Sequence, residues 1–137
     1  MFKRIKLTHT MTLNPKLGIM GFLGFIGFIS FIPEINGQEK NTFLFFIFFG
    51  FFSFYYIGKM SNTFIDERFE KNKYRADAIS LRVGFLSIIM VFILIMTVLK
   101  IKDSETILNI LMATISFSFG IVIFLQSYLL YRFENEE

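Results

Sequence analysis

The sequence predicts an all-α, polytopic membrane protein with four transmembrane helices arranged as two antiparallel hairpins. Four long stretches carry no charged residue, at positions 17–32, 43–58, 83–99 and 107–131. Hydrophobic residues make up 54% of the chain and charged residues only 18%, below the roughly 25% that is usual in soluble domains. All of the charged residues lie outside these stretches, in the segments between them and toward the two ends of the chain. This pattern is typical of helices that each need about 20 apolar residues to cross a bilayer.

The four stretches define the predicted topology. The expected spans are, approximately, residues 17–33, 43–59, 82–100 and 106–131, with a helical loop at 60–81. These segments occupy most of the 137 residues, so we expect a single membrane domain over 1–137.

Basic residues are distributed unequally between the two sides of this topology. Eleven lie in the N-terminal segment up to Lys16, in the loop from Lys59 to Arg82, and at Arg132. The other side holds only three, namely Lys40, Lys100 and Lys102. The excess of Lys and Arg on cytoplasmic loops predicts that both termini and the central loop are cytoplasmic.

The first predicted helix carries small residues at every third position, namely Gly18, Gly21, Gly24 and Gly27, followed by Ser30. Phenylalanines repeat at the same spacing from Phe22 to Phe31. On an α-helix this period produces a ridge that winds slowly around the axis. Small residues let neighbouring membrane helices approach closely. We therefore expect helix packing here, against the chain's own helices or, alternatively, against a partner. Pro33 and the Asn36-Gly37 pair predict the end of the helix and a turn.

The second and third helices are predicted to be plain membrane spans. Residues 43–58 hold eight phenylalanines, and the apolar side chains of this segment favour insertion by roughly 3–7 kcal/mol. Residues 83–99 contain few small or polar side chains, and nothing in them suggests chemistry.

The fourth helix has the clearest pattern of small and polar residues on one face. This face consists of Asn109, Ala113, Ser116, Gly120 and Ser127. Ser116 and Gly120 form a small-xxx-small pair, which predicts a close-packed contact. Asn109 and Gln126 are the candidate intramembrane polar residues, and they either form interhelical hydrogen bonds or line a polar cavity.

The central loop is predicted to be helical and to continue into the third span. Thr63 and Asp66 have the spacing of a capping box, which predicts a helix from about Thr63. Glu67/Lys71 and Lys73/Asp77 are opposite charges four residues apart, a spacing that supports helices.

One face of this predicted loop helix resembles a coiled-coil contact, with alternating spacings of four and three. The face comprises Ile65, Phe69, Asn72, Ala76, Ile79 and Val83. Packing within the chain is the favoured interpretation, and docking of a partner is the alternative. The candidate partner surface is Asp66, Glu67, Arg68, Phe69, Asn72 and Ala76.

The sequence lacks the motifs and ligand clusters that are typical of enzymes and metal sites. The chain has no cysteine, and its only histidine, His9, lies outside the spans. Metal sites need several His, Cys or carboxylate ligands at suitable spacing. We identify no phosphate-binding, dinucleotide or nucleophile motif. The sequence therefore predicts no catalytic, cofactor-binding or metal residues, no nucleic-acid partner and no enzyme.

Two parts of the chain resemble a known group of proteins. These are Asn14-Pro15-Lys16-Leu17-Gly18 before the first helix, and Asp66-Glu67-Arg68 with Asn72 and Ala76 before the third. Both are similar to uncharacterised small four-span membrane proteins of low-GC Gram-positive bacteria, often encoded beside helix-turn-helix regulators. The resemblance implies a multi-pass protein of the bacterial plasma membrane with a role beside a regulator, transporter or peptide-toxin system.

The sequence leads to a functional hypothesis that involves no catalysis. We expect a non-enzymatic membrane protein that acts by helix association with a membrane protein partner or with itself, in an accessory, regulatory or immunity-type role. The alternative is a small homo-oligomeric transporter or pore. Proton-coupled transport usually needs an intramembrane carboxylate, and none of the four uncharged stretches contains one.

Overall fold

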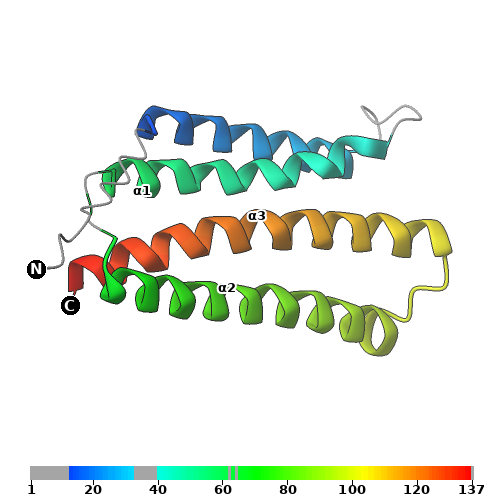
Figure 1. The fold of residues 1–137 in the computed structure, drawn as a ribbon. Coiled ribbons are helices and arrows are strands. Elements are labelled where there is room, and N and C mark those ends of the chain that lie inside the picture. Colours follow the sequence, from blue (N-terminus) through cyan, green and yellow to red (C-terminus); the bar gives the residue numbers. More distant parts are fainter. Residues whose placement is uncertain (1–12, 33–39, 62, 64, 137) are drawn as a thin grey trace, which may run out of the picture.

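The computed structural model describes residues 13–32, 40–61, 63 and 65–136 and consists of helices joined by short connections (Figure 1). Two of the elements are 3₁₀-helices and one is a π-helical turn. The elements are η1 (Pro15–Phe31, 3₁₀), η2 (Lys40–Phe52, 3₁₀), α1 (Ser53–Lys59), α2 (Glu67–Leu94), η3 (Ile95–Leu99, π) and α3 (Ser104–Glu136). Because α1 continues η2 and η3 continues α2, the chain forms four long helices, and the predicted all-α fold class is confirmed. Among the predicted features, Pro33, Asn36-Gly37 and His9 lie outside the described residues.

The four long helices pack as two antiparallel hairpins placed side by side (Figure 1). The first hairpin pairs η1 with η2, the second pairs α2 with α3, and α3 also packs against η2 and α1. The helices therefore lie in the order η1, η2, α3, α2, with η1 and α2 at the two edges.

The first hairpin is held together by a stripe of small residues on η1 that faces a row of aromatic residues. Each glycine of the stripe lies against one aromatic residue of η2 or α1. The pairs are Gly18 with Tyr55, Gly21 with Phe52, Gly24 with Phe49, and Gly27 with Phe46. A methyl group at Gly21 would lie 2.6 Å from the Phe52 ring, so only glycine fits between these backbones without a shift. At the end of the stripe, Ser30 is hydrogen-bonded to Thr42.

A second row of contacts runs beside the glycine stripe. The phenylalanines of η1 meet those of η2 edge to face, with ring centroids 5.0–5.4 Å apart. The pairs are Phe22 with Phe52, Phe25 with Phe49, Phe28 with Phe46, and Phe31 with Phe43. Edge-to-face pairs at such separations are favourable beyond the area that they bury.

The predicted winding ridge is wrong, because η1 is a 3₁₀-helix and not an α-helix. A 3₁₀-helix has three residues per turn, so side chains three residues apart are stacked directly above one another. The glycines and phenylalanines therefore form two straight stripes. The pairing between η1 and η2 continues from Gly18 to Gly27 without drifting to another face.

The 3₁₀ conformation also lengthens the first helix. Among the described residues, three helices are apolar and long enough in residues to cross a bilayer, namely Thr42–Lys59, Glu67–Leu99 and Ser104–Glu136. Pro15–Phe31 has only 17 residues. At a rise of about 2.0 Å per residue, 17 residues extend about 34 Å, compared with about 26 Å for an α-helix. The hydrocarbon core is about 30 Å thick, so η1 is long enough to span it.

The third helix begins later than predicted. The first residue of α2 is Glu67, and Asp66, not Thr63, is the N-cap, because the Asp66 side chain accepts a hydrogen bond from the Phe69 backbone N–H at 2.8 Å. The expectation that the charged segment continues without a break into the apolar span is confirmed, since one helix covers Glu67–Leu94.

The buried face of α2 also differs from the predicted one. Asn72 and Ala76 are buried, as predicted for the face that resembles a coiled-coil contact. The buried row then continues through Ser80 and Gly84, not through Ile79 and Val83. The reason is packing distance: Gly84 lies directly against Val122 of α3, where a larger side chain would clash. A row of small residues four apart lets α2 approach α3 closely.

α3 has small residues on both of its packed sides. Ala113, Ser116, Gly120 and Ser127 are buried, and Gly120 faces the backbone carbonyl of Phe46 on η2. On the opposite side, the Ser118 hydroxyl is hydrogen-bonded to Ser87 of α2 at 2.8 Å. The small residues of α3 therefore join the two hairpins.

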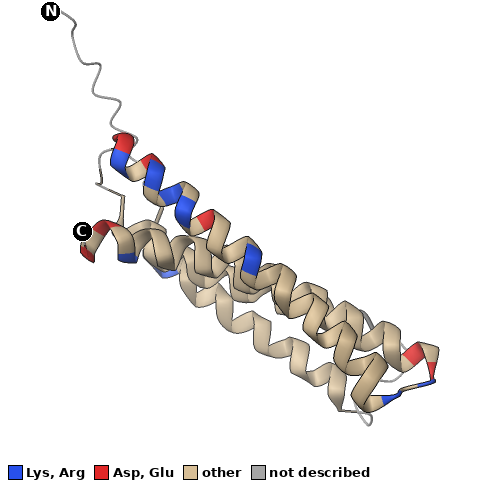
Figure 2. Cartoon of the chain, turned by 90° about the horizontal axis from the view of Figure 1, so that it is seen from below, with Lys and Arg blue, Asp and Glu red and all other residues tan. Residues whose placement is uncertain are grey.

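Charged residues gather at the ends of the molecule (Figure 2). Most of them lie where α1 ends, α2 begins and α3 ends, which we call the charged end. A smaller group lies between η3 and α3, namely Lys100, Lys102 and Asp103.

The glycine stripe gives a testable prediction. We expect Gly24→Ala to destabilise the protein by about 1–2 kcal/mol, since overpacking costs about 1–3 kcal/mol and outweighs a gain in helix propensity of up to about 1 kcal/mol. The methyl group would lie 2.8 Å from the Phe49 ring. Unfolding in detergent, followed by circular dichroism, measures the change.

Two further variants make this experiment specific. Gly24→Ala combined with Phe49→Leu should recover part of the loss, because the smaller side chain makes room for the methyl group. Met20→Ala, on the exposed side of η1, is the control. A Gly24→Ala protein that is as stable as the natural chain would contradict the close contact.

Candidate functional site

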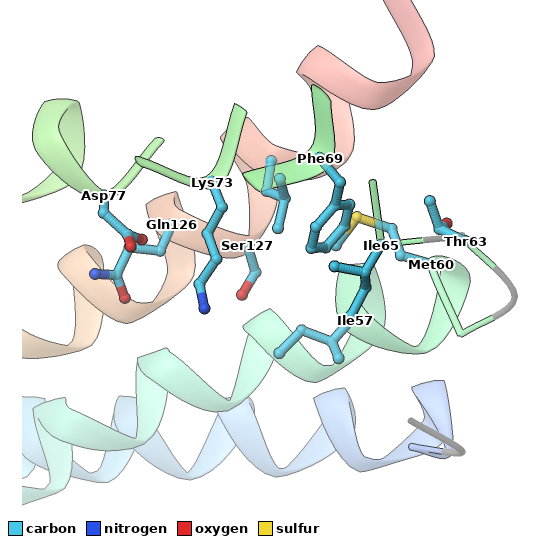
Figure 3. A pocket seen from close by; sticks show the side chains of 10 residues that line it. Ile57, Met60, Thr63, Ile65, Phe69, Lys73, Asp77, Gln126 and Ser127 are labelled. Carbon is cyan, nitrogen blue, oxygen red and sulfur yellow. The ribbon is translucent and has the colours of Figure 1, made fainter. Parts of the chain in front are cut away.

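A cavity of about 420 Å³ lies at the charged end (Figure 3). It lies between the two hairpins, where α1, the connection after it, α2 and α3 meet. Its lining residues are Ile57, Met60, Thr63, Ile65, Phe69, Lys73, Asp77, Gln126, Ser127 and Leu130.

One side of the cavity is polar. Lys73 and Asp77 come from α2, where their spacing of four residues puts them on the same face, one turn apart. Gln126 and Ser127 come from α3. In Figure 3 Asp77 and Gln126 lie at the end of the cavity farther from Phe69, and the Lys73 side chain extends toward α1. The cavity is thus lined by one cation, one anion and neutral polar groups.

The predicted ion pairs along α2 are absent. Neither Glu67–Lys71 nor Lys73–Asp77 forms an ion pair between these described residues. Lys73 and Asp77 line the cavity, so their charges are available to whatever enters it.

The remaining side of the cavity is apolar. Ile57 and Met60 contribute from the end of the first hairpin, Ile65 and Phe69 from the start of α2, and Leu130 from α3. Figure 3 shows the Phe69 ring and the Ile57 and Ile65 side chains grouped on this side. The cavity therefore has a hydrophobic part and a hydrogen-bonding part next to each other.

A cluster of tyrosines marks the depth of the cavity along the helices. Tyr56 of α1 contacts Tyr128 and Tyr131 of α3, with ring centroids 5.3 and 5.4 Å apart. The Lys59 ammonium lies 4.5 Å from the centre of the Tyr55 ring. Tyrosines concentrate at the membrane–water interface, where an apolar ring and a polar hydroxyl are both accommodated. Because Gln126 and Leu130 lie on the same turns of α3 as Tyr128, the cavity lies at this level.

Near the charged end, α2 and α3 are joined by polar contacts. The Asn72 amide donates a hydrogen bond to the Glu134 carboxylate at 2.8 Å. Arg68 lies 3.6 Å from the same carboxylate, whose side chain is only 8% exposed. The Arg75 guanidinium lies over the ring of Phe133, 4.4 Å from its centre. These contacts fix the first turns of α2 against the last turns of α3.

The predicted partner surface is divided by the structure. Asn72 and Ala76 are buried against α3, and Phe69 is half-buried in the cavity. Asp66, Glu67 and Arg68 are exposed, and Asp66 also caps α2. The packing residues Gly18, Gly21, Gly24, Gly27, Ala113, Ser116 and Gly120 are all buried within the chain.

The two intramembrane polar candidates are not brought together. Asn109 and Gln126 are both half-buried and lie near opposite ends of α3, about 26 Å apart along the axis. Gln126 lines the cavity, and Asn109 does not. Lys73 and Asp77 were not predicted from the sequence to line a cavity. The four-residue spacing of Phe69, Lys73 and Asp77, which puts all three on one face of α2, could have indicated it.

One comparison with known proteins indicates the environment of the chain. The family model described as "Predicted membrane protein (DUF2178)" matches residues 13–134. Neither a curated protein nor a solved structure matches the chain. Within the described residues, no three His, Cys, Asp or Glu side chains are grouped so that they could hold a metal ion.

The contact between α2 and α3 gives a second prediction. In a double-mutant cycle, Asn72→Ala and Glu134→Ala should show a coupling of about 1–3 kcal/mol, since a mostly buried carboxylate loses a hydrogen-bond donor. Unfolding in detergent measures the four proteins of the cycle.

The matched control is the exposed pair Arg132–Glu136, four residues apart on α3 and joined at 2.7 Å. Its alanine cycle should give no more than about 0.5 kcal/mol, because exposed helical ion pairs contribute little. Equal couplings in the two cycles would show that the Asn72 contact does not stabilise the fold.

Proposed function

Because this chain belongs to the DUF2178 family of predicted membrane proteins, we propose that it is a non-enzymatic, multi-pass protein of the bacterial plasma membrane. Its proposed activity is lateral association within the bilayer, with a membrane protein partner or with a second copy of itself. An accessory, regulatory or immunity-type role follows from this kind of activity.

The observation that supports association is the open arrangement of the helices. α3 is packed on two opposite sides, by η2 and by α2. Its remaining surface carries exposed aromatic side chains, with Phe119 58% exposed, while Phe117, 41% exposed, also contacts the rings of Phe46 and Phe49 on η2. A row of helices leaves two broad faces on which another transmembrane helix can pack.

The alternative, a transporter or pore, receives less support. The four uncharged stretches offer no acid or base for coupling to protons. The polar candidates Asn109 and Gln126 lie about 26 Å apart along α3 and share no cavity among the described residues. We therefore favour association over conduction.

We further propose that the charged end faces the cytoplasm, together with both termini. The described residues at this end include Lys59, Arg68, Lys71, Lys73 and Arg75, whereas the opposite end has Lys40, Lys100 and Lys102. The positive-inside bias supports this orientation.

The association hypothesis is tested by cysteine cross-linking in native membranes, for which the absence of natural cysteines is convenient. Single cysteines are placed at Phe22 of η1, Met90 of α2, and Phe117 and Phe119 of α3, so that each probes one side of the row. A specific interface predicts a cross-linked product at one or two of these positions only. Equal products at all four positions, or none, would contradict association, as would substrate flux into liposomes that contain this protein alone.

The orientation is tested separately by maleimide labelling. Lys102→Cys should react with a membrane-impermeant maleimide in intact cells, and Lys71→Cys should react only after permeabilisation, because both side chains are exposed but lie at opposite ends. The reverse labelling pattern would show that the orientation is inverted.

A further inference from the structure

From the cavity at the charged end, we propose a binding site for a free α-amino acid with a bulky apolar side chain, of the kind found in leucine, methionine or phenylalanine. The carboxylate of the amino acid contacts Lys73, its ammonium contacts Asp77, and its side chain lies among the apolar residues of the lining. This inference goes beyond the proposed association and does not depend on it.

The polar and apolar parts of the cavity follow one another along the helices. Asp77 and Gln126 lie at the end farther from Phe69, toward the middle of the helices (Figure 3). Most of the apolar lining lies at the charged end, because Phe69 is in the first turn of α2 and Met60 directly follows α1. A matching ligand therefore has its polar groups deep in the molecule and its apolar group toward the water at the charged end. A membrane phospholipid has the reverse orientation.

The charges of the lining favour a zwitterion. Lys73 and Asp77 are the only charged residues among the described lining, and neither forms an ion pair with another described residue. They lie one turn apart on the same face of α2, so opposite charges on one small molecule reach both. A carboxylic acid would leave Asp77 uncompensated, and an amine would bring a second cation close to Lys73. An amino acid carries both charges on a single carbon atom.

The neutral polar groups of the lining favour a primary ammonium. Gln126 and Ser127 of α3 offer a carboxamide oxygen and a hydroxyl oxygen as hydrogen-bond acceptors. A primary ammonium has three N–H donors for these oxygens and for the Asp77 carboxylate, whereas a trimethylammonium has none. Quaternary amines typically bind in aromatic cages, and Phe69 is the only aromatic residue among the described residues of this lining.

The apolar part of the cavity favours a bulky hydrocarbon side chain. Ile57, Ile65 and Phe69 are grouped there (Figure 3), together with Met60 and Leu130. The volume of about 420 Å³ is in the range of pockets for small ligands. Each methylene group that a ligand buries against such a surface strengthens binding about fourfold, so glycine and other small zwitterions gain little here.

The ligand class is tested with the full chain in detergent by isothermal titration calorimetry with leucine, methionine and phenylalanine. We expect saturable binding of one molecule per chain. For the amino acid that binds most tightly, the analogues without the carboxylate or without the ammonium should each bind about tenfold more weakly, the effect of one lost charge-assisted hydrogen bond. For leucine these analogues are isopentylamine and 4-methylpentanoate. Glycine should also bind at least about tenfold more weakly, because it lacks the side chain.

Two variants of the lining assign the charged contacts. Lys73→Gln should weaken binding of the amino acid about tenfold and should not weaken binding of the amine analogue, which has no carboxylate for Lys73 to contact. Asp77→Asn should weaken binding of the amino acid by a similar factor and should not weaken binding of the acid analogue. These reciprocal patterns distinguish direct contacts from a general loss of structure.

A matched pair of controls lies on the same helix outside the cavity lining. Glu67→Gln and Lys71→Gln change one acid and one base four residues apart, both exposed, and should leave the affinity unchanged. Circular dichroism verifies that each variant is folded, and the series of ligands on the natural chain requires no variant.

Four outcomes would overturn the proposal. They are no saturable binding of any of the three amino acids at millimolar concentration, equal affinity for glycine, equal effects of the cavity and control variants, and tighter binding of leucylglycine than of leucine. The last result would assign the cavity to the end of a peptide.

Discussion

The structure depends on close approach between helices in a solvent that does not drive them together. Lipid chains are as apolar as leucine, so burying leucine between two membrane helices gains little. The chain instead brings backbones together at small residues. Glycines of η1 receive the rings of η2, Gly84 receives Val122, and Gly120 faces the Phe46 carbonyl. In each interface a small residue on one helix is matched to a larger group on its neighbour, and these matches fix the order of the helices in the row.

In the first hairpin, the close approach of the helices depends on an unusually long 3₁₀-helix, η1. Long 3₁₀-helices are rare because their hydrogen-bond geometry is poorer than that of the α-helix. Here a strict three-residue repeat of glycine and phenylalanine gains a full set of contacts only when each turn has three residues. The greater rise per residue also lets 17 residues extend across the hydrocarbon. Packing and membrane thickness therefore favour the same conformation.

Much of the fold could be predicted from the sequence, and the remainder depends on how closely the helices approach one another. Four uncharged stretches were enough to predict four helices in two hairpins, and the charge pairs from Glu67 to Asp77 predicted a charged helix leading into the third span. The sequence pattern of η1 contained its three-residue period, but we assigned it to an α-helix because that is the usual membrane helix. The capping residue was misplaced because Thr63 and Asp66 both fit the N-cap preference. The cavity was missed because Lys73, Asp77 and Gln126 come together only when α2 lies against α3.

The conformation of η1 provides the most direct test of this account. Solid-state NMR of the ¹⁵N-labelled protein in oriented bilayers measures the orientation of each peptide plane along a helix. The account predicts a repeat of three residues over Pro15–Phe31, with contacts between Gly24 and the Phe49 ring. A repeat of 3.6 residues, with the phenylalanine contacts drifting away from the glycine stripe, would contradict it.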